Sequence, residues 1–212
     1  MTPFSRRAFV TAAVAALLVG CGGHPAGPPA TARSRSTPSV PGTVSTSPPP
    51  RTAAGSARPL GRSVPVGLRI PAIGVDTPVM RLGLAPDGSV QVPPIAAHDR
   101  AGWYRHSPTP GQTGPSVILG HVTVGAYGDG VFRRLARLRH GDRIVVRLEN
   151  GRSAVFAVTG VRTVAKADFP TDEVYGDVGR PELRLITCGG PRSGSGYLDN
   201  VIVFAALTSA NP

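Results

Sequence analysis

The segment that decides the fold, residues 142–166, has the sequence DRIVVRLENGRSAVFAVTGVRTVAK. Apolar and polar residues alternate on both sides of Asn150-Gly151, which is the pattern of strands with one buried face. An Asn-Gly pair between two such runs is a strong hairpin signal, because both residues tolerate the positive φ angles of a tight turn. The segment therefore predicts two antiparallel strands, at 142–150 and 153–166.

Further short apolar segments of the same kind lie on both sides of this hairpin. They cover residues 66–73, 77–84, 89–93, 115–122, 181–188 and 200–207. Eight short strands with frequent turn signals are typical of an all-β barrel or sandwich. One short helix is predicted at 131–138, because Val131, Phe132, Leu135 and Leu138 would share one side of it.

The N-terminus has the features of an export signal. Arg6-Arg7 precedes an apolar run, residues 8–19, which is too short to span a bilayer and has the size of a signal-peptide core. The arginine pair loosely resembles a twin-arginine signal, and Leu18-Val19-Gly20-Cys21 resembles a bacterial lipobox. We therefore expect residues 1–21 to be a signal segment with lipidation at Cys21; a plain signal anchor is the alternative. In both cases the remainder lies outside the cytoplasm.

Residues 22–60 have the composition of a tether. They contain nine prolines, many Ser, Thr and Gly residues, and no aromatic or acidic residue. Such a segment cannot bury enough apolar surface to offset the entropy of ordering, so it is predicted to be a disordered linker. The folded domain is then predicted at residues 61–212.

The net charge of +11 does not indicate a nucleic-acid-binding protein. The six cations of residues 1–60 lie in the predicted signal and linker, and the 17 cations of residues 61–212 face 12 acids. No basic face or recognition motif accompanies them. We therefore expect no nucleic-acid partner.

Cys188 is the candidate nucleophile. It ends the strand-like run LRLITC (183–188), glycines follow it, and the other cysteine, Cys21, lies far away in the signal segment. An unpaired cysteine in an exported domain indicates a reactive thiol. The alternative is a buried small hydrophobic residue, since free cysteine is often buried. The position at a strand end favours a rim, where a thiol can react.

His121 is the candidate partner of this thiol. It closes the run SVILGH (116–121) as Cys188 closes its own strand, and Gly120 would permit close backbone approach. A thiol needs a neighbouring base, because only a small fraction is thiolate at neutral pH. Two such residues at two strand ends are the pattern of a Cys–His site on a β scaffold.

Four motifs together resemble the sortases, most of all the class F group of actinobacteria. They are LITC followed by glycine (185–189), SVILGH (116–121), GWYRHSPTPGQTG (102–114) and IPAIGVDTPV (70–79). The resemblance covers residues 64–208. It implies an eight-stranded β-barrel and a membrane-tethered extracellular cysteine transpeptidase without a cofactor. Such an enzyme cleaves a sorting signal of the Leu-Pro-x-Thr-Gly type and joins the acyl group to an amine of the cell wall or of a pilin.

The same resemblance implies roles for individual residues. The Cys188 thiolate would attack the Thr carbonyl and form a thioacyl-enzyme, and His121 would exchange protons with the leaving and incoming amines. Thr187 matches the Thr-Cys pair of the family and is expected to contribute to substrate binding; an ordinary β-branched strand residue is the alternative.

The chain departs from the family at the arginine that precedes the last strand. That strand opens with Tyr197-Leu198-Asp199-Asn200 and has no arginine there. Arg192, the cation in the preceding glycine-rich loop, is the first candidate for the role. Asn200 could donate a neutral hydrogen bond, and Arg184 shares the strand face of Cys188.

Two other functions remain open. A sortase-like lipoprotein could bind sorting peptides with little turnover, because the arginine is missing. An L,D-transpeptidase is disfavoured because its Ser-x-Gly-Cys motif is absent. A metal enzyme is disfavoured because the sequence has no close cluster of His, Cys and carboxylate ligands.

Overall fold

A computed structural model describes residues 57–194 and 196–211. The predicted signal segment, with Cys21, and most of the predicted linker lie outside the described residues. Ala57 and Leu60 pack against the core, and the Leu60 N–H donates to the Gly111 carbonyl at 2.8 Å. The last four residues of the predicted linker therefore belong to the folded domain. Within the described part, no helix has the length and apolar character to cross a membrane.

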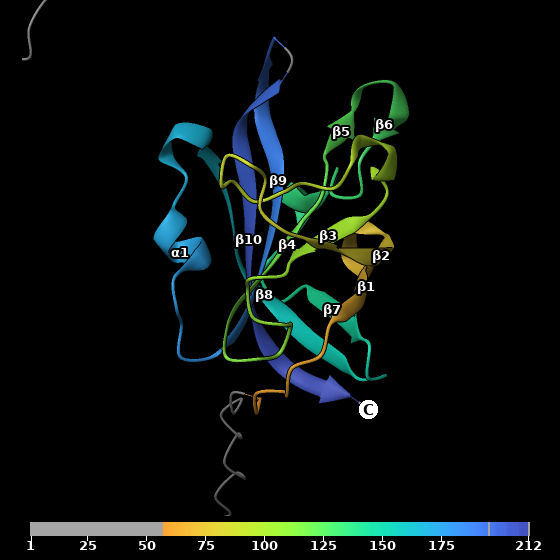
Figure 1. Ribbon diagram of the computed structural model, residues 1–212, viewed down its shortest axis with the longest axis vertical. Coiled ribbons are helices and arrows are strands. Elements are labelled where there is room, and N and C mark those ends of the chain that lie inside the picture. The colour runs from red at the N-terminus through yellow and green to blue at the C-terminus, as the bar shows by residue number, and fades with distance from the viewer. Residues whose placement is uncertain (1–56, 195, 212) are drawn as a thin grey trace, which may run out of the picture. The chain divides into compact units, whose positions relative to one another are not determined.

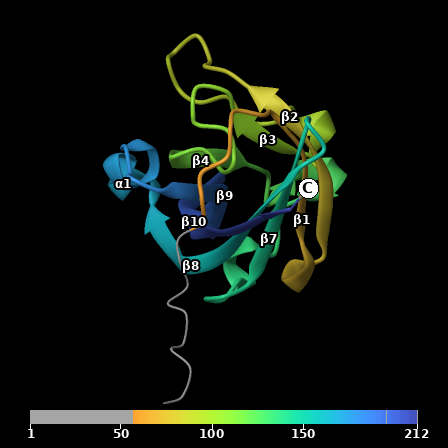
Figure 2. The ribbon, with the colours of Figure 1, turned by 90° about the horizontal axis from the view of Figure 1, so that it is seen from below.

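Eight strands close into a barrel, in the order β1-β2-β3-β4-β9-β10-β8-β7 (Figures 1 and 2). Their bounds are β1 Pro65–Ile70, β2 Val75–Leu82, β3 Ala101–Tyr104, β4 Gly114–Leu119, β7 Arg143–Leu148, β8 Ser153–Ala165, β9 Pro181–Ser193 and β10 Gly196–Asn211. A small hairpin, β5 (Thr123–Val124) and β6 (Gly128–Asp129), stands beside the barrel. The all-β barrel predicted from the sequence is confirmed.

Helices are few and short. The one α-helix of the described residues is α1, Thr171–Tyr175, in the connection between β8 and β9. Short 3-10 helices occupy Pro71–Ile73, Ile95–Ala97, Gly125–Tyr127, Leu135–Arg137 and Lys166–Asp168.

The predicted hairpin at 142–166 is confirmed. β7 and β8 pair in antiparallel fashion, from Arg143 opposite Ala157 to Arg147 opposite Ser153. Gly151 has a φ of 81°, as the tight turn requires, and the Leu148 N–H closes the turn onto the Arg152 carbonyl at 2.8 Å.

The prediction of a strand at 89–93 is wrong, and β3 takes its place in the barrel. The 89–93 segment makes one isolated bridge, between Leu84 and Val90, and then runs into Pro93 and Pro94, which cannot donate to a ladder. The sequence predicts no strand at the position of β3, which has only four residues. It enters the barrel through Trp103, which is 1% exposed, and through Gly102, against which Leu82 packs.

The helix predicted at 131–138 is also wrong in type. Only Leu135–Arg137 is helical, and it is a 3-10 helix. Phe132, Leu135 and Leu138 are all buried, as predicted, but their spacing of three residues matches the three-residue turn of a 3-10 helix.

Two apolar clusters lie on opposite faces of the barrel wall. The interior cluster includes Trp103, Ile118, Leu183, Leu185 and Val203. The outer cluster lies where α1 covers β4, β9 and β10, and its buried members are Leu82, Val117, Leu119, Val174, Ile186 and Ile202. Because side chains alternate along a strand, the second cluster shows which residues of β4, β9 and β10 face outward.

Candidate active site

The register of two parallel strands brings the predicted pair together. Each residue of β4 pairs with the residue 67 positions later in β9, from Gly114 with Pro181 to Leu119 with Ile186. The Gly120 N–H extends this ladder by donating to the Ile186 carbonyl at 3.1 Å. His121 and Cys188 are separated by the same 67 positions, so they follow the ladder at neighbouring points of the barrel rim.

Cys188 faces the outer side of the barrel. Ile186, two residues before it, belongs to the outer cluster, and alternation puts Cys188 on the same face. The side chain is half-buried and its thiol is free of any disulfide. This partial exposure on the outer face favours a reactive thiol over the alternative of a buried small hydrophobic residue.

His121 is held from two sides. Its backbone carbonyl accepts the Phe132 N–H at 2.8 Å, and Phe132 packs directly on Gly120. Its ring nitrogen Nε2 lies 2.6 Å from the Pro93 carbonyl oxygen. A carbonyl can only accept, so Nε2 must carry the proton of this bond. In the neutral ring Nδ1 is then the unprotonated nitrogen, and it is the one available to take a proton.

The segments after His121 and after Cys188 are tied to each other. The Thr123 and Tyr197 hydroxyls are 2.8 Å apart, across 74 residues of sequence. Thr123 opens the β5–β6 hairpin, and Tyr197 lies near the start of β10. This contact links the β5–β6 hairpin, which follows His121, to the β9–β10 hairpin, which contains Cys188.

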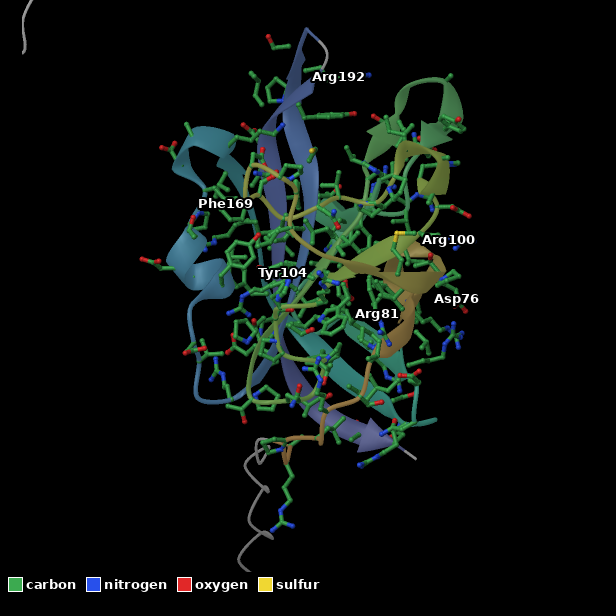
Figure 3. All side chains as sticks on the ribbon, in the orientation of Figure 1. Asp76, Arg81, Arg100, Tyr104, Phe169 and Arg192 are labelled. Atoms are coloured by element: carbon green, nitrogen blue, oxygen red, sulfur yellow. The ribbon has the colours of Figure 1, made fainter. Side chains whose placement is uncertain are left out.

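Arg192 lies near the tip of the β9–β10 hairpin, away from the barrel body (Figure 3). It is exposed, its Cα pairs with that of Tyr197, and its guanidinium stacks 5.3 Å from the centre of the Tyr197 ring. It stands four residues beyond Cys188 along the strand. At this position the charge of Arg192 contributes to the electrostatic potential near Cys188 more readily than to a hydrogen bond beside the thiol.

Asn200 is the direct neighbour of Cys188. The two residues are Cα partners in the antiparallel β9–β10 ladder. Side chains of such partners lie on the same face, with Cβ atoms about 4.5–5.5 Å apart. The Asn200 amide therefore reaches the space beside the thiol, and its side chain is half-buried.

Arg184 does not take part in the site. Its side chain is 4% exposed and forms an ion pair with Glu182 at 2.6 Å. It also donates to the Glu173 carbonyl and stacks 4.7 Å from the centre of the Phe204 ring. Desolvation acts to raise the pKa of Glu182, but the hydrogen bonds and charges of Arg180 and Arg184 outweigh it and lower that pKa. Arg184 therefore anchors the sheet beneath α1.

The Thr187 side chain points away from the outer face that carries Cys188, which does not fit the expected role in substrate binding. Thr187 is 4% exposed and alternates with Cys188, so its side chain points to the barrel interior. Its Cα partner in β10, Val201, belongs to the interior cluster. Thr187 contributes to the wall behind the thiol, as the alternative interpretation had it.

Two contacts of the site were not found from the sequence. Pro93 lay in a segment that had been assigned to a strand, and its role is played by a backbone carbonyl, which no side-chain pattern reveals. The Thr123–Tyr197 contact joins two hairpins whose proximity depends on the barrel register. Among the described residues, no group of three His, Cys, Asp or Glu side chains is arranged to hold a metal ion.

Solved structures of similar fold come from several bacteria. Sortase A from Corynebacterium diphtheriae is 21% identical, with 69% of this chain and 61% of that chain covered and a TM-score of 0.52. Sortase A from Listeria monocytogenes is 17% identical, with 70% and 90% covered and a TM-score of 0.52. The SrtA sortase from Actinomyces oris is 27% identical, with 76% and 89% covered and the same TM-score. This chain thus spans less than two thirds of the Corynebacterium chain.

The sequence itself identifies the family. No curated protein matches it at a significant level. Residues 68–208 match the Sortase domain family. This range includes His121 and Cys188. It also includes all eight barrel strands except the first three residues of β1 and the last three of β10. The chain therefore belongs to the sortase family.

Proposed function

We propose that this protein is a cysteine transpeptidase that cleaves a sorting signal of the Leu-Pro-x-Thr-Gly type and transfers the acyl part to an amine. The observation that carries the proposal is the shared 67-residue offset, which puts His121 and Cys188 two residues beyond the last β4–β9 pair, Leu119 with Ile186; β9 itself continues past Cys188 to Ser193, so the predicted strand end at Cys188 is wrong. Membership of the sortase family supports the general activity, and the actinobacterial class F assignment remains part of the proposal.

In the first step the Cys188 thiolate attacks the carbonyl carbon of the Thr residue. A C–S bond forms, the C–N bond to Gly breaks, and the His121 imidazolium gives its proton to the leaving amine. In the second step neutral His121 takes a proton from the incoming amine, which attacks the thioester and releases Cys188. The bond from Nε2–H to the Pro93 carbonyl fixes the ring, so Nδ1 is the nitrogen that transfers both protons.

The negative oxygen of each tetrahedral intermediate needs a hydrogen-bond donor. Asn200, the cross-strand partner of Cys188, has a side-chain amide that can supply one. Its amide gives a neutral hydrogen bond, which is weaker than the charge-assisted bond of an arginine. Arg192 is the second candidate, and movement of the β9–β10 hairpin would have to bring it down to the site.

We further propose that the domain acts at the outer face of the membrane, tethered through its N-terminal segment and lipidated at Cys21. The acceptor is then an amine of the cell wall or of a pilin. The absence of an arginine at the start of β10 favours one second candidate: a lipoprotein that binds sorting peptides with little turnover.

Mass spectrometry of the full chain, incubated with a library of Leu-Pro-x-Thr-Gly peptides, tests the proposal. A thioacyl adduct on Cys188 is expected, together with release of the Gly-containing fragment. Cys188→Ala should abolish both while preserving the circular dichroism spectrum, and His121→Ala should slow turnover by at least about 10²-fold. His140→Ala, which changes an exposed histidine outside the site, is the matched control.

Two results would reject a transpeptidase. If no thiol reagent labels Cys188 in the native protein, the residue is not a nucleophile. If peptides bind but neither an adduct nor a fragment forms, the binding lipoprotein is the better description.

A further inference from the structure

A cavity of about 440 Å³ lies at the far end of the outer face that carries Cys188. Its lining includes Val117 of β4, Tyr104 at the end of β3 and Tyr175 of α1. Figure 3 labels Phe169 beside α1 and Tyr104 between α1 and the middle of the barrel. The cavity is thus built where the outer cluster meets the covering segment.

The cavity and the Cys–His pair share one continuous surface. Val117, Tyr104, Tyr175 and Val90 line the cavity and also belong to the outer cluster or pack against it. The same cluster contains Leu119 and Ile186, each two residues before His121 and Cys188. The apolar face therefore runs from the thiol to the cavity.

The ladder gives the separation between the thiol and the cavity. Val117 and Pro115, which both line the cavity, pair with Arg184 and Glu182, four and six residues before Cys188. At about 3.3 Å per residue these levels lie about 13 and 20 Å from Cys188 along the strand. An extended peptide advances by a similar distance per residue. In a bound extended substrate, the cavity would therefore lie level with the fourth to sixth residues before the Thr whose carbonyl is attacked.

The direction of the bound peptide follows from the surface on each side of Cys188. On the hairpin side the chain continues into Pro191, Arg192 and Ser193, which are all exposed. On the other side lie the apolar side chains of Leu119, Ile186 and Ile202. The Leu and Pro of the signal gain more from the apolar side, so the part of the substrate before the cleaved bond runs toward the cavity.

The cavity walls select for apolar side chains. Tyr104 and Tyr175 meet edge to face, with ring centres 6.2 Å apart, and Leu84 and Val90 add apolar side chains to the lining. Leu84 is 45% exposed, so part of its surface is free to be covered by a ligand. Burial, with a smaller contribution from Tyr104, raises the pKa of Tyr175, whose hydroxyl therefore stays neutral. His106 and Asp177 form a polar edge.

We infer that this cavity is a subsite for an apolar side chain that precedes the four-residue recognition signal in the substrate. The Leu of a Leu-Pro-x-Thr signal stands only three residues before the attacked Thr, so the residues that reach the cavity lie upstream of it. The inference rests on the proposed function. It adds that substrates are selected by sequence outside the signal as well as by the signal itself.

Three peptides test the inference with the full chain. They are acetyl-Leu-Pro-Ala-Thr-Gly-amide, the same peptide extended at its N-terminus by Ala-Val-Val, and the same peptide extended by Gly-Ser-Ser. Burying one apolar side chain should give the Ala-Val-Val peptide a kcat/KM about tenfold above the other two. Leu84→Arg should remove this advantage. Val66→Arg, which changes a valine that is 46% exposed on β1 outside the cavity, should retain it.

The failure of this inference and the failure of the proposed function look different. Equal kcat/KM for the three peptides in the unmodified protein, or an equal loss for all three in Leu84→Arg, would overturn the upstream subsite. If no peptide is turned over, the proposed activity fails instead. The subsite is then tested by fluorescence anisotropy of the labelled peptides on Cys188→Ala, where the Ala-Val-Val peptide should still bind about tenfold more tightly and equal affinities would overturn it.

Discussion

Gly120→Ala should damage both the stability of the barrel and the placement of His121. A Cβ at residue 120 would lie 2.6 Å from Cδ2 of Phe132 and 2.7 Å from Cγ1 of Val131. Phe132 is fully buried and cannot swing into solvent. Relief must then come from a shift at the end of β4, where the Gly120 N–H is bound to Ile186 and the His121 carbonyl to Phe132.

The size of the effect follows from these contacts. Overpacking of a rigid core costs about 1–3 kcal/mol, and each kcal/mol lowers the Tm of a domain of about 150 residues by about 2–4 °C. A displacement of about 1 Å at a catalytic group lowers turnover by about 10²-fold. Urea unfolding and peptide turnover, measured on the same preparation, separate the two losses.

Gly160→Ala provides the matched control. Gly160 lies in β8, and a Cβ there would meet no atom within 4 Å, so its stability should change by less than 1 kcal/mol and its turnover should be retained. The reasoning is refuted if Gly120→Ala is as stable and active as Gly160→Ala. If Gly120→Ala is destabilised but its folded fraction turns over normally, then Gly120 does not control the position of His121.

Three further outcomes are expected. In steady-state turnover assays, Asn200→Ala should lower kcat about 10²–10³-fold and Arg192→Ala less than about threefold, because only Asn200 is the strand partner of Cys188. The reverse order would give the oxyanion role to Arg192. Glu182→Gln leaves Arg184 buried without its ion pair and should cost about 3–5 kcal/mol near pH 7. The pKa of Glu182 is lower in the folded protein, so the ionised carboxylate stabilises the fold above about pH 4.5, and this stabilisation is lost as the pH falls through the pKa of the folded state. The free energies of urea unfolding of the variant and the wild type should therefore converge in acid. Cys21→Ala should release the protein from membranes into the medium, as fractionation would show, whereas retention of the uncleaved signal would indicate a signal anchor.

The sequence could predict those parts of the fold that depend on local residue patterns. The β7–β8 hairpin is marked by alternation and by Asn150-Gly151, and both features survive in the structure. β3 was missed because its four residues are too few to show a period, and it is held by Trp103 packing into the interior. The 89–93 segment has the right alternation, but a strand also requires a partner, and sequence alone does not provide one.

The same distinction between local sequence patterns and tertiary contacts applies to the candidate site. Cys188 and His121 could be named because each closes an apolar run of the sequence and because the motifs resemble those of a known family, although β9 continues past Cys188 to Ser193. Their alignment depends on the pairing of β4 with β9, which is a non-local property of the barrel. The Pro93 carbonyl and the strand partnership of Asn200 with Cys188 depend on tertiary structure too, so neither contact could be read from residue types.

Because β4 pairs with β9, the chain between His121 and Cys188 tolerates insertions and deletions at some positions and not at others. Residues added at the exposed Asn150-Gly151 turn lengthen a loop at a small entropic cost and leave the ladder as it is. One residue deleted from Pro181–Thr187 shifts every later side chain of β9 to the opposite face. Cys188 would then point into the barrel, beside the apolar interior. We therefore expect peptide turnover to survive a ten-residue insertion in the turn and to be lost after a single deletion in the strand.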